Sequence, residues 1–312
     1  MTLDISVIIP AHNPDAERLR LTLNGLCVQT LDRARWELLI VDNASERFPD
    51  KEWISRHSPI RTRLIRETSL GLSAARRAGF REALGDVAVL VDDDNVLQPD
   101  YLEQALQILS AHPRVGLAGG PSTPIFESEP KGWAREFLPL LALRDLGSRE
   151  IVSSGLRPDG RVANHYPAYA PIGAGMVLRR KAWESWLMAS SAGMTDRRGN
   201  DLSSGGDNEI VLCAMSAGWE VGYFPSLSLS HLIPAGRLEP RYLARLNRGI
   251  QRSWMRVLTR YDANPWPPLS RTGAALRKIK SWFAYRAWSS PEAQIRWNGA
   301  CGQYEGRSGH CP

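Results

Sequence analysis

A buried strand that ends in three carboxylates constrains this 312-residue chain more than any other feature. Residues 87–91 are Val-Ala-Val-Leu-Val, and Asp92, Asp93 and Asp94 follow directly. An unbroken run of β-branched and aliphatic residues predicts a strand covered on both faces. Such a strand presents its acids at the carboxyl edge of an α/β sheet, where ligands bind. Oxygen ligands suit Mg²⁺ or Mn²⁺, so the acids indicate either a cation site or a solvated acidic turn.

Strands and helices alternate along the first 240 residues, which predicts an α/β fold with a mostly parallel sheet. Asn13 is expected to cap the first helix, with Pro14 at its first position. Residues 121–170 are rich in Pro, Gly and Ser and are expected to form long irregular loops over the sheet. The expected strands are 3–10, 36–41, 61–66, 87–91, 115–118, 175–179, 219–224 and 227–231.

The charge of the chain divides it into two regions. Residues 241–312 carry 13 Lys/Arg and 3 Asp/Glu, or +10, whereas residues 1–240 carry 26 and 30, or −4. We therefore expect a domain over 1–240 and a basic, Trp-containing helical extension over 241–312 with a poorly ordered glycine-rich tail. Within it, 241–260 predicts a basic amphipathic helix, which is either a packed helix with a charged face or a peripheral membrane contact.

Cysteine usage and hydropathy indicate the compartment. Cys27, Cys213, Cys301 and Cys311 are far apart or terminal, which argues against a zinc site or a disulfide framework. No apolar run is long enough to cross a bilayer, and the N-terminus lacks the basic start of a signal peptide. We expect a cytoplasmic protein, either free or peripheral on the inner face of the membrane. No motif indicates nucleic acid as a partner.

Five short motifs occur in the order typical of one enzyme family. They span residues 6–13, 40–45, 71–76, 91–94 and 205–209. Together they resemble the family 2 glycosyltransferases over roughly residues 4–235. The resemblance implies a GT-A fold and a metal-dependent, hexosyltransferase-like enzyme. It implies inverting transfer of sugar from a nucleotide-diphosphate sugar, with Mn²⁺ or Mg²⁺ as cofactor.

The resemblance assigns the nucleotide to the first two motifs. Pro10, His12 and Asn13 precede a helix N-terminus, where backbone N–H groups and the helix dipole suit an anion. Asp42, followed by Asn43, matches the family's base-binding aspartate. The alternatives are simple helix capping for Asn13 and a turn residue for Asp42.

The third and fourth motifs add charge to the site. Arg76 matches a nucleotide-contacting segment, although the family's Ala-Arg-Asn is Ala-Arg-Arg here; an ion pair with a nearby acid is the alternative. In the family the acids matching Asp92 and Asp94 contact the ribose and the metal. Asp93 points to the opposite face of an extended chain and would support its neighbours.

The resemblance places the chemistry at the fifth motif. Asp207 matches the general base, with Gly206 where the family often has Glu; a helix N-terminal residue stabilised by the dipole is the alternative. Glu209 becomes the base if the alignment shifts by two. His231 is either a metal ligand or a structural histidine. Residues 173–176 resemble an acceptor-side wall, or else pack tightly on the sheet.

The reaction class has alternatives. Residues 251–254 depart from the Gln-x-x-Arg-Trp motif of processive members, so a single transfer to a saccharide, lipid-linked or other hydroxyl acceptor is expected. The product would belong to polysaccharide or glycoconjugate biosynthesis. A nucleotidyltransferase acting on a sugar phosphate would need a glycine-rich basic loop that is absent. A catalytically inactive nucleotide-sugar-binding protein would have lost Asp92, Asp94 or Asp207, and all three are present.

Overall fold

A large sheet with an antiparallel strand at its middle forms the core of the protein. The computed structural model describes residues 3–60, 62–154, 166–189, 202 and 205–309. Within these residues the strand order is β3-β2-β1-β4-β9-β6-β10-β8. The first four strands are parallel, as are β6 and β10, whereas β9 is antiparallel to both neighbours and β8 to β10. The strands are β1 (Ile5–Ala11), β2 (Trp36–Asn43), β3 (Thr62–Glu67), β4 (Val87–Leu90), β6 (Val115–Gly119), β8 (Ile151–Ser154), β9 (Val177–Arg179) and β10 (Glu220–Tyr223).

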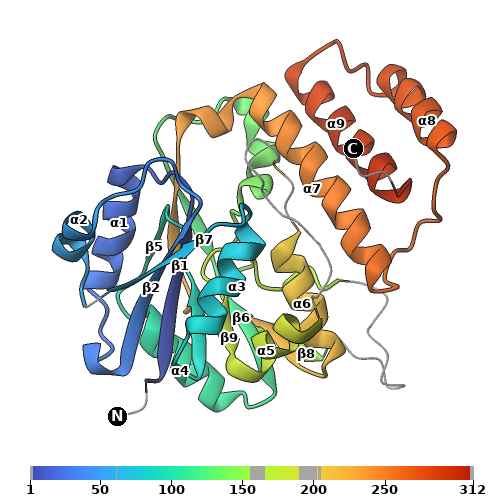
Figure 1. Cartoon of the computed structure of the whole chain (residues 1–312). Helices are drawn as coiled ribbons and strands as arrows, with labels where there is room; N and C mark the ends of the chain where they lie inside the picture. Colours follow the sequence, from blue (N-terminus) through green and yellow to red (C-terminus); the bar gives the residue numbers. More distant parts are fainter. Residues whose placement is uncertain (1–2, 61, 155–165, 190–201, 203–204, 310–312) are drawn as a thin grey trace.

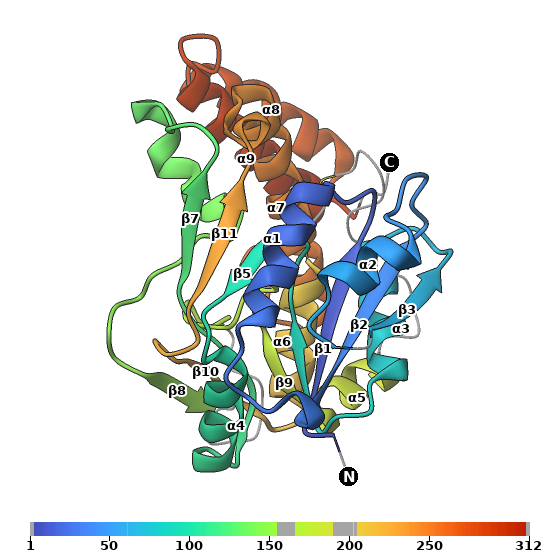
Figure 2. The ribbon, with the colours of Figure 1, turned by 90° about the vertical axis from the view of Figure 1, so that its left-hand side faces the viewer.

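Helices cover both faces of this sheet (Figures 1 and 2). Val87 and Val89 of β4 pack on one face with α1, α2 and α4, whereas Ala88 and Leu90 pack on the other with α3, α5 and α6. The predicted strand is therefore buried on both sides, and the α/β prediction is confirmed. The helices are α1 (Ala16–Cys27), α2 (Lys51–His57), α3 (Leu72–Glu82), α4 (Tyr101–Ala111), α5 (Arg180–Ala189) and α6 (Gly206–Ser216), with a short 3₁₀ turn η1 (Arg33–Arg35).

A second, smaller sheet lies beyond the acidic end of β4. It has the order β5-β11-β7, with β5 (Asn95–Leu97), β7 (Ser122–Phe126) and β11 (Leu229–Ile233). Strands β7 and β8 and the 3₁₀ helix η2 (Gly132–Leu141) all fall in 121–170, so the prediction of purely irregular loops there was wrong. β7 pairs with β11, about a hundred residues later, and no local pattern reveals such a pairing. Residues 155–165 lie outside the described ranges.

The first helix begins later than the sequence indicated. Asp15, not Asn13, is the N-cap of α1, and its carboxylate accepts a hydrogen bond from the backbone N–H of Arg18 at 3.0 Å. Asn13 instead adopts a left-handed conformation, with φ of 48°. Its side-chain oxygen accepts hydrogen bonds from the backbone N–H groups of Glu46 and Arg47, which satisfies it outside the helix.

The C-terminal region is helical, as predicted. It contains α7 (Pro240–Arg260), α8 (Arg271–Ala284) and α9 (Pro291–Arg307), preceded by the 3₁₀ turn η3 (Ala235–Leu238). Figure 1 shows α9 between α7 and α8, and the contacts of α9 agree. No helix in the described part of the chain is long and apolar enough to cross a membrane.

Glycines near the C-terminus serve helix packing. Gly299, Gly302 and Gly306 face α7, and a Cβ on Gly302 would lie 2.2 Å from the carbonyl oxygen of Arg248. The glycines therefore let α9 approach α7 closely. The predicted poorly ordered tail does not extend back to these residues, and residues 310–312 lie outside the described ranges.

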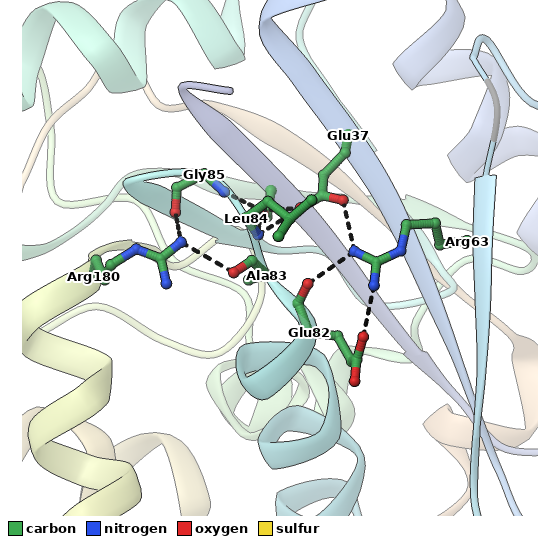
Figure 3. Close-up of polar contacts among 8 residues, drawn as sticks. Glu37, Arg63, Glu82, Ala83, Leu84, Gly85 and Arg180 are labelled. Atoms are coloured by element: carbon green, nitrogen blue, oxygen red, sulfur yellow. Dashed lines mark hydrogen bonds and ion pairs between the residues drawn. The ribbon is translucent and has the colours of Figure 1, made fainter. Parts of the chain in front are cut away.

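A buried carboxylate holds the connection that leads into β4 (Figure 3). Glu37 is 7% exposed. Its Oε1 accepts hydrogen bonds from the hydroxyl of Ser6 and the backbone N–H of Leu84, both at 2.7 Å. Its Oε2 lies 3.0 Å from Nη1 of Arg63, which also pairs with Glu82. This network fixes the start of the strand that carries the acids, at the opposite end from them.

Replacing Glu37 with Ala is expected to lower the free energy of unfolding by about 2–4 kcal/mol. The change removes the acceptor of the Ser6 hydroxyl and leaves the N–H of Leu84 with only the Ser6 hydroxyl oxygen, at 3.1 Å, in a buried place. Urea unfolding followed by circular dichroism measures the loss. Glu82→Ala is the matched control, because Glu82 pairs with the same Arg63 but its side chain is 51% exposed. Equal losses in the two variants would show that burial of Glu37 does not set its contribution.

Candidate active site

A pocket of about 280 Å³ opens at the carboxyl ends of β1 and β4. Its far wall comes from Leu140, Leu141 and Ala142 at the end of η2 and from Tyr242 and Leu246 of α7. The structure brings eight predicted site residues to its lining: Pro10, His12, Asn13, Asn43, Asp92, Asp93, Asp94 and His231. Asp42, Arg76 and Asp207 are not among the lining residues.

Side chains of the β1 and β2 loops shape the pocket rim. Nδ1 of His12 lies 2.7 Å from the carbonyl oxygen of Asn43, and the side chain of Asn43 accepts a hydrogen bond from the backbone N–H of Gly71 at 2.8 Å. The backbone N–H of Asn13 donates to the hydroxyl of Ser45. Asn43 thus connects the loop after β1 to the start of α3. These contacts position the loops, and a nucleotide role for His12, Asn13 and Asn43 stays a prediction.

Asp42 is engaged by the protein itself. Its carboxylate pairs with Arg66 of β3, and its Oδ1 accepts a hydrogen bond from the backbone N–H of Ser45 at 3.1 Å. The turn interpretation therefore describes Asp42 in this structure. A base could use the carboxylate only if it replaced Arg66, whose side chain is 52% exposed.

Asp94 is the most enclosed acid of the cluster. Its side chain is 4% exposed, with Oδ1 3.2 Å from Nε2 of His231 and Oδ2 2.8 Å from Nη2 of Arg237. The pairing of β11 with β5 sets His231 opposite Asn95 and so beside Asp94. The two predicted metal ligands thus meet. Sequence reasoning missed Arg237, and its position six residues after His231, just beyond a strand, was the one available signal.

The donor set fits a cation that shares its ligands with a substrate. Among the described residues, no group of three or more His, Cys, Asp or Glu side chains is arranged to hold a metal ion. Mg²⁺ is commonly held by one or two carboxylates and completes its shell with waters and substrate phosphates. Asp94 supplies such a carboxylate, and His231 lies beside it as the second predicted ligand. Burial, together with the charges of Asp94 and Asp92, raises the pKa of Asp93 to about 7. A bound cation would relieve the repulsion among these carboxylates.

Arg76 is buried behind the pocket, close to Asp92 and Gly173. It is 2% exposed, and its Nη2 is 4.0 Å from Oδ1 of Asp92, while its Nε and Nη1 have no hydrogen-bond partner. A Cβ on Gly173 would lie 2.3 Å from Nη2, so this glycine is needed for close packing. The backbone N–H of Gly173 also donates to Oδ2 of Asp207 at 3.1 Å. Arg76 therefore lies at ion-pair distance from Asp92, and a nucleotide contact by its segment stays a prediction.

Glu209 is held in the core rather than at the site. It is 1% exposed, Nε1 of Trp186 donates to its Oε2 at 3.2 Å, and Nη1 of Arg260 lies 3.2 Å from its Oε1. Asp207, at the start of α6, is only partly buried. Of the two acids that the sequence offered as a base, Asp207 has the freer carboxylate.

The sequence model of glycosyl transferase family 2 matches residues 6–186. The chain belongs to this family. The GT-A fold predicted from the five motifs agrees with the α/β sheet and its covering helices. The family segment contains the β1 and β2 loops, Arg76 and the acids of β4, whereas Asp207, His231 and Arg237 lie beyond its end.

Three relatives that match part of this chain have names that denote sugar transfer. An uncharacterized glycosyltransferase of Haemophilus influenzae is 29% identical over 119 residues, 38% of this chain and 38% of the relative. Glycosyltransferase AglE of Haloferax volcanii is 32% identical over 119 residues, 37% and 38% of the two chains. A dolichol-phosphate mannosyltransferase of Pyrococcus furiosus is 29% identical over 167 residues, 52% and 41%. The chain thus matches about two fifths of the length of each relative.

Proposed function

We propose that this family 2 member transfers one sugar from a nucleotide-diphosphate sugar to an acceptor hydroxyl, with inversion and with Mn²⁺ or Mg²⁺. The observation that carries the proposal is the meeting of Asp94 and His231 in a pocket at the carboxyl edge of the sheet. Residues of two segments line this pocket together, namely the loop after β1 and the acids after β4.

Asp94 and His231 would hold the metal ion, next to the place of the donor diphosphate. The cation, when bound, neutralises the charge that develops on the departing diphosphate. Arg18 and Arg237 line the same pocket and add positive charge for the phosphates. Asp92 would face the ribose, as the family resemblance implies. Catalysis in such a site comes mainly from positioning and electrostatics.

Asp207 would act as the general base. It would accept the proton of the acceptor hydroxyl while that oxygen bonds to the anomeric carbon from the face opposite the diphosphate. The bond from the anomeric carbon to the diphosphate oxygen breaks in the same step, so the configuration inverts. The hydrogen bond from Gly173 holds the carboxylate toward residues 173–176, the proposed acceptor wall. A saccharide or lipid-linked acceptor would enter there.

The proposed compartment is reducing. Cys27, Cys213 and Cys301, the cysteines among the described residues, are free thiols, as expected of a protein in the cytoplasm.

A thermal-shift panel tests the donor proposal. UDP, GDP, dTDP and CDP sugars are added with and without Mn²⁺. We expect one nucleotide class to stabilise the protein only in the presence of Mn²⁺; at a hundredfold excess over Kd the gain is about 2.7 kcal/mol. The matching nucleoside monophosphate with Mn²⁺ is the control, since it lacks the diphosphate. Absence of a metal-dependent shift with every donor would contradict the proposal.

A further inference from the structure

The outer side of α8 carries large apolar side chains. Leu276 is 67% exposed, Ile279 60% and Phe283 64%, and their spacing of three and four residues aligns them on one face of the helix. Trp288, in the turn after the helix, is 59% exposed, and its ring centroid lies 5.9 Å from that of Phe283. The four side chains, here called the α8 stripe, form one apolar surface.

The other side of α8 is already used. Ala274 and Ser281 are buried, and Trp282 packs edge-on against Trp297 of α9 at a centroid distance of 4.7 Å. The α8 stripe therefore points away from α9, on the outermost helix in Figure 1. Burying a stripe of this kind stabilises a protein, whereas leaving it in water is costly, so such a surface indicates an interaction site.

The helix for which a membrane contact was predicted, 241–260, lacks such a surface. Its large apolar residues are buried or half-buried, with Leu243, Leu246 and Met255 inside the protein. The amphipathic pattern of α7 is explained by its packing on α9 and η2. A membrane contact through α7 would rest on its arginines alone.

The sequence of α8 and of the segments that flank it carries charge of one sign. Residues 263–291 contain five Lys/Arg and no Asp or Glu. Arg277 and Lys280 are exposed beside the stripe. A cavity of about 530 Å³ next to Ile279 is lined by four further cations, Arg248, Arg252, Arg271 and Lys278, and by one acid, Glu305, which pairs with Arg248 and Lys278. A partner that covers this face must therefore combine an apolar layer with negative charge.

We propose that α8 and the turn after it dock on an anionic lipid bilayer. A helix with aliphatic and aromatic residues on one side and cations beside them lies in the plane of the interface. Trp288 and Tyr285, which are both exposed, suit the boundary between headgroups and acyl chains. Arg277 and Lys280 would contact lipid phosphates, and the α8 stripe would enter the acyl region. The inference does not depend on the proposed sugar transfer.

Vesicle co-sedimentation of the full chain tests this proposal. We expect binding to vesicles of phosphatidylcholine and phosphatidylglycerol in equal parts, and at least tenfold weaker binding to phosphatidylcholine alone. Ile279→Ser/Phe283→Ser removes the centre of the α8 stripe and should weaken binding by roughly tenfold or more. Arg277→Gln/Lys280→Gln should weaken it by on the order of tenfold and reduce its salt dependence.

Leu84→Ser is the matched control, because Leu84 is 61% exposed but lies on the α3–β4 connection. It should bind anionic vesicles like the unchanged protein. Melting temperatures establish that each variant is folded. Failure of the unchanged protein to bind either vesicle overturns the proposal, as does normal binding by both double variants. A dimer in analytical ultracentrifugation that is lost in Ile279→Ser/Phe283→Ser would also overturn it, since a second copy would then cover the stripe.

Discussion

Replacing Asp207 with Asn is expected to lower the rate of sugar transfer by about 10²–10⁴-fold and to leave donor binding unchanged. The amide has the shape of the carboxylate, and its oxygen can still accept the hydrogen bond that the backbone N–H of Gly173 donates to Asp207. The local structure should therefore survive. An amide cannot take the proton of an attacking hydroxyl, so only the chemical step should suffer.

Single-turnover transfer and donor titration separate these two effects. Glu209→Gln is the control, because Glu209 lies two residues along the same helix and is the competing base. Its replacement removes the buried carboxylate that lies 3.2 Å from Nη1 of Arg260, so a lower melting temperature is expected. Turnover per folded molecule should stay within a few-fold of the original. A result in which Glu209→Gln abolishes turnover and Asp207→Asn does not would reverse the assignment.

The parts of the fold that the sequence predicted are those encoded locally. The run Val87–Leu90 is apolar because both of its faces are covered, and the acids after it lie at the pocket because the strand ends there. The smaller sheet was not predicted, since Ser122 pairs with Leu229 across more than a hundred residues. Strand β7 has an exposed middle, so its own residues do not show the alternation of a half-buried strand.

In the candidate site, too, the residues were predicted from local motifs, whereas their contacts depend on pairings between distant segments. His231 was a candidate from its motif position, and its approach to Asp94 depends on β11 pairing with β5. Arg237 was missed because its contact with Asp94 is made by the turn η3, whose path no periodic pattern indicates. Asp42 was expected either to bind a base or to serve as a turn residue, and its pairing with Arg66, which was not foreseen, comes from the register of β2 and β3.

Replacing Asp94 with Asn is expected to abolish Mn²⁺ binding at this site and to reduce transfer by at least about 10³-fold, because a catalytic metal stabilises developing charge by several kcal/mol. Asp94 is the only carboxylate that, among the described residues, lies beside His231 in an ion pair. Its loss leaves the proposed cation with a single neutral ligand. The cation would then have to be held by substrate phosphates and water.

Replacing Arg237 with Gln is expected to have the opposite effect on Mn²⁺ affinity. Arg237 occupies Oδ2 of Asp94, so a divalent cation must compete with its guanidinium. Removing that competitor should tighten Mn²⁺ binding roughly tenfold in the absence of donor, a gain of about 1.4 kcal/mol. Calorimetric titration of Mn²⁺ into each variant measures both effects without any sugar substrate. If Asp94→Asn bound Mn²⁺ normally, or if Arg237→Gln bound it more weakly than the original protein, Asp94 would not be the metal ligand and Arg237 would not be its competitor.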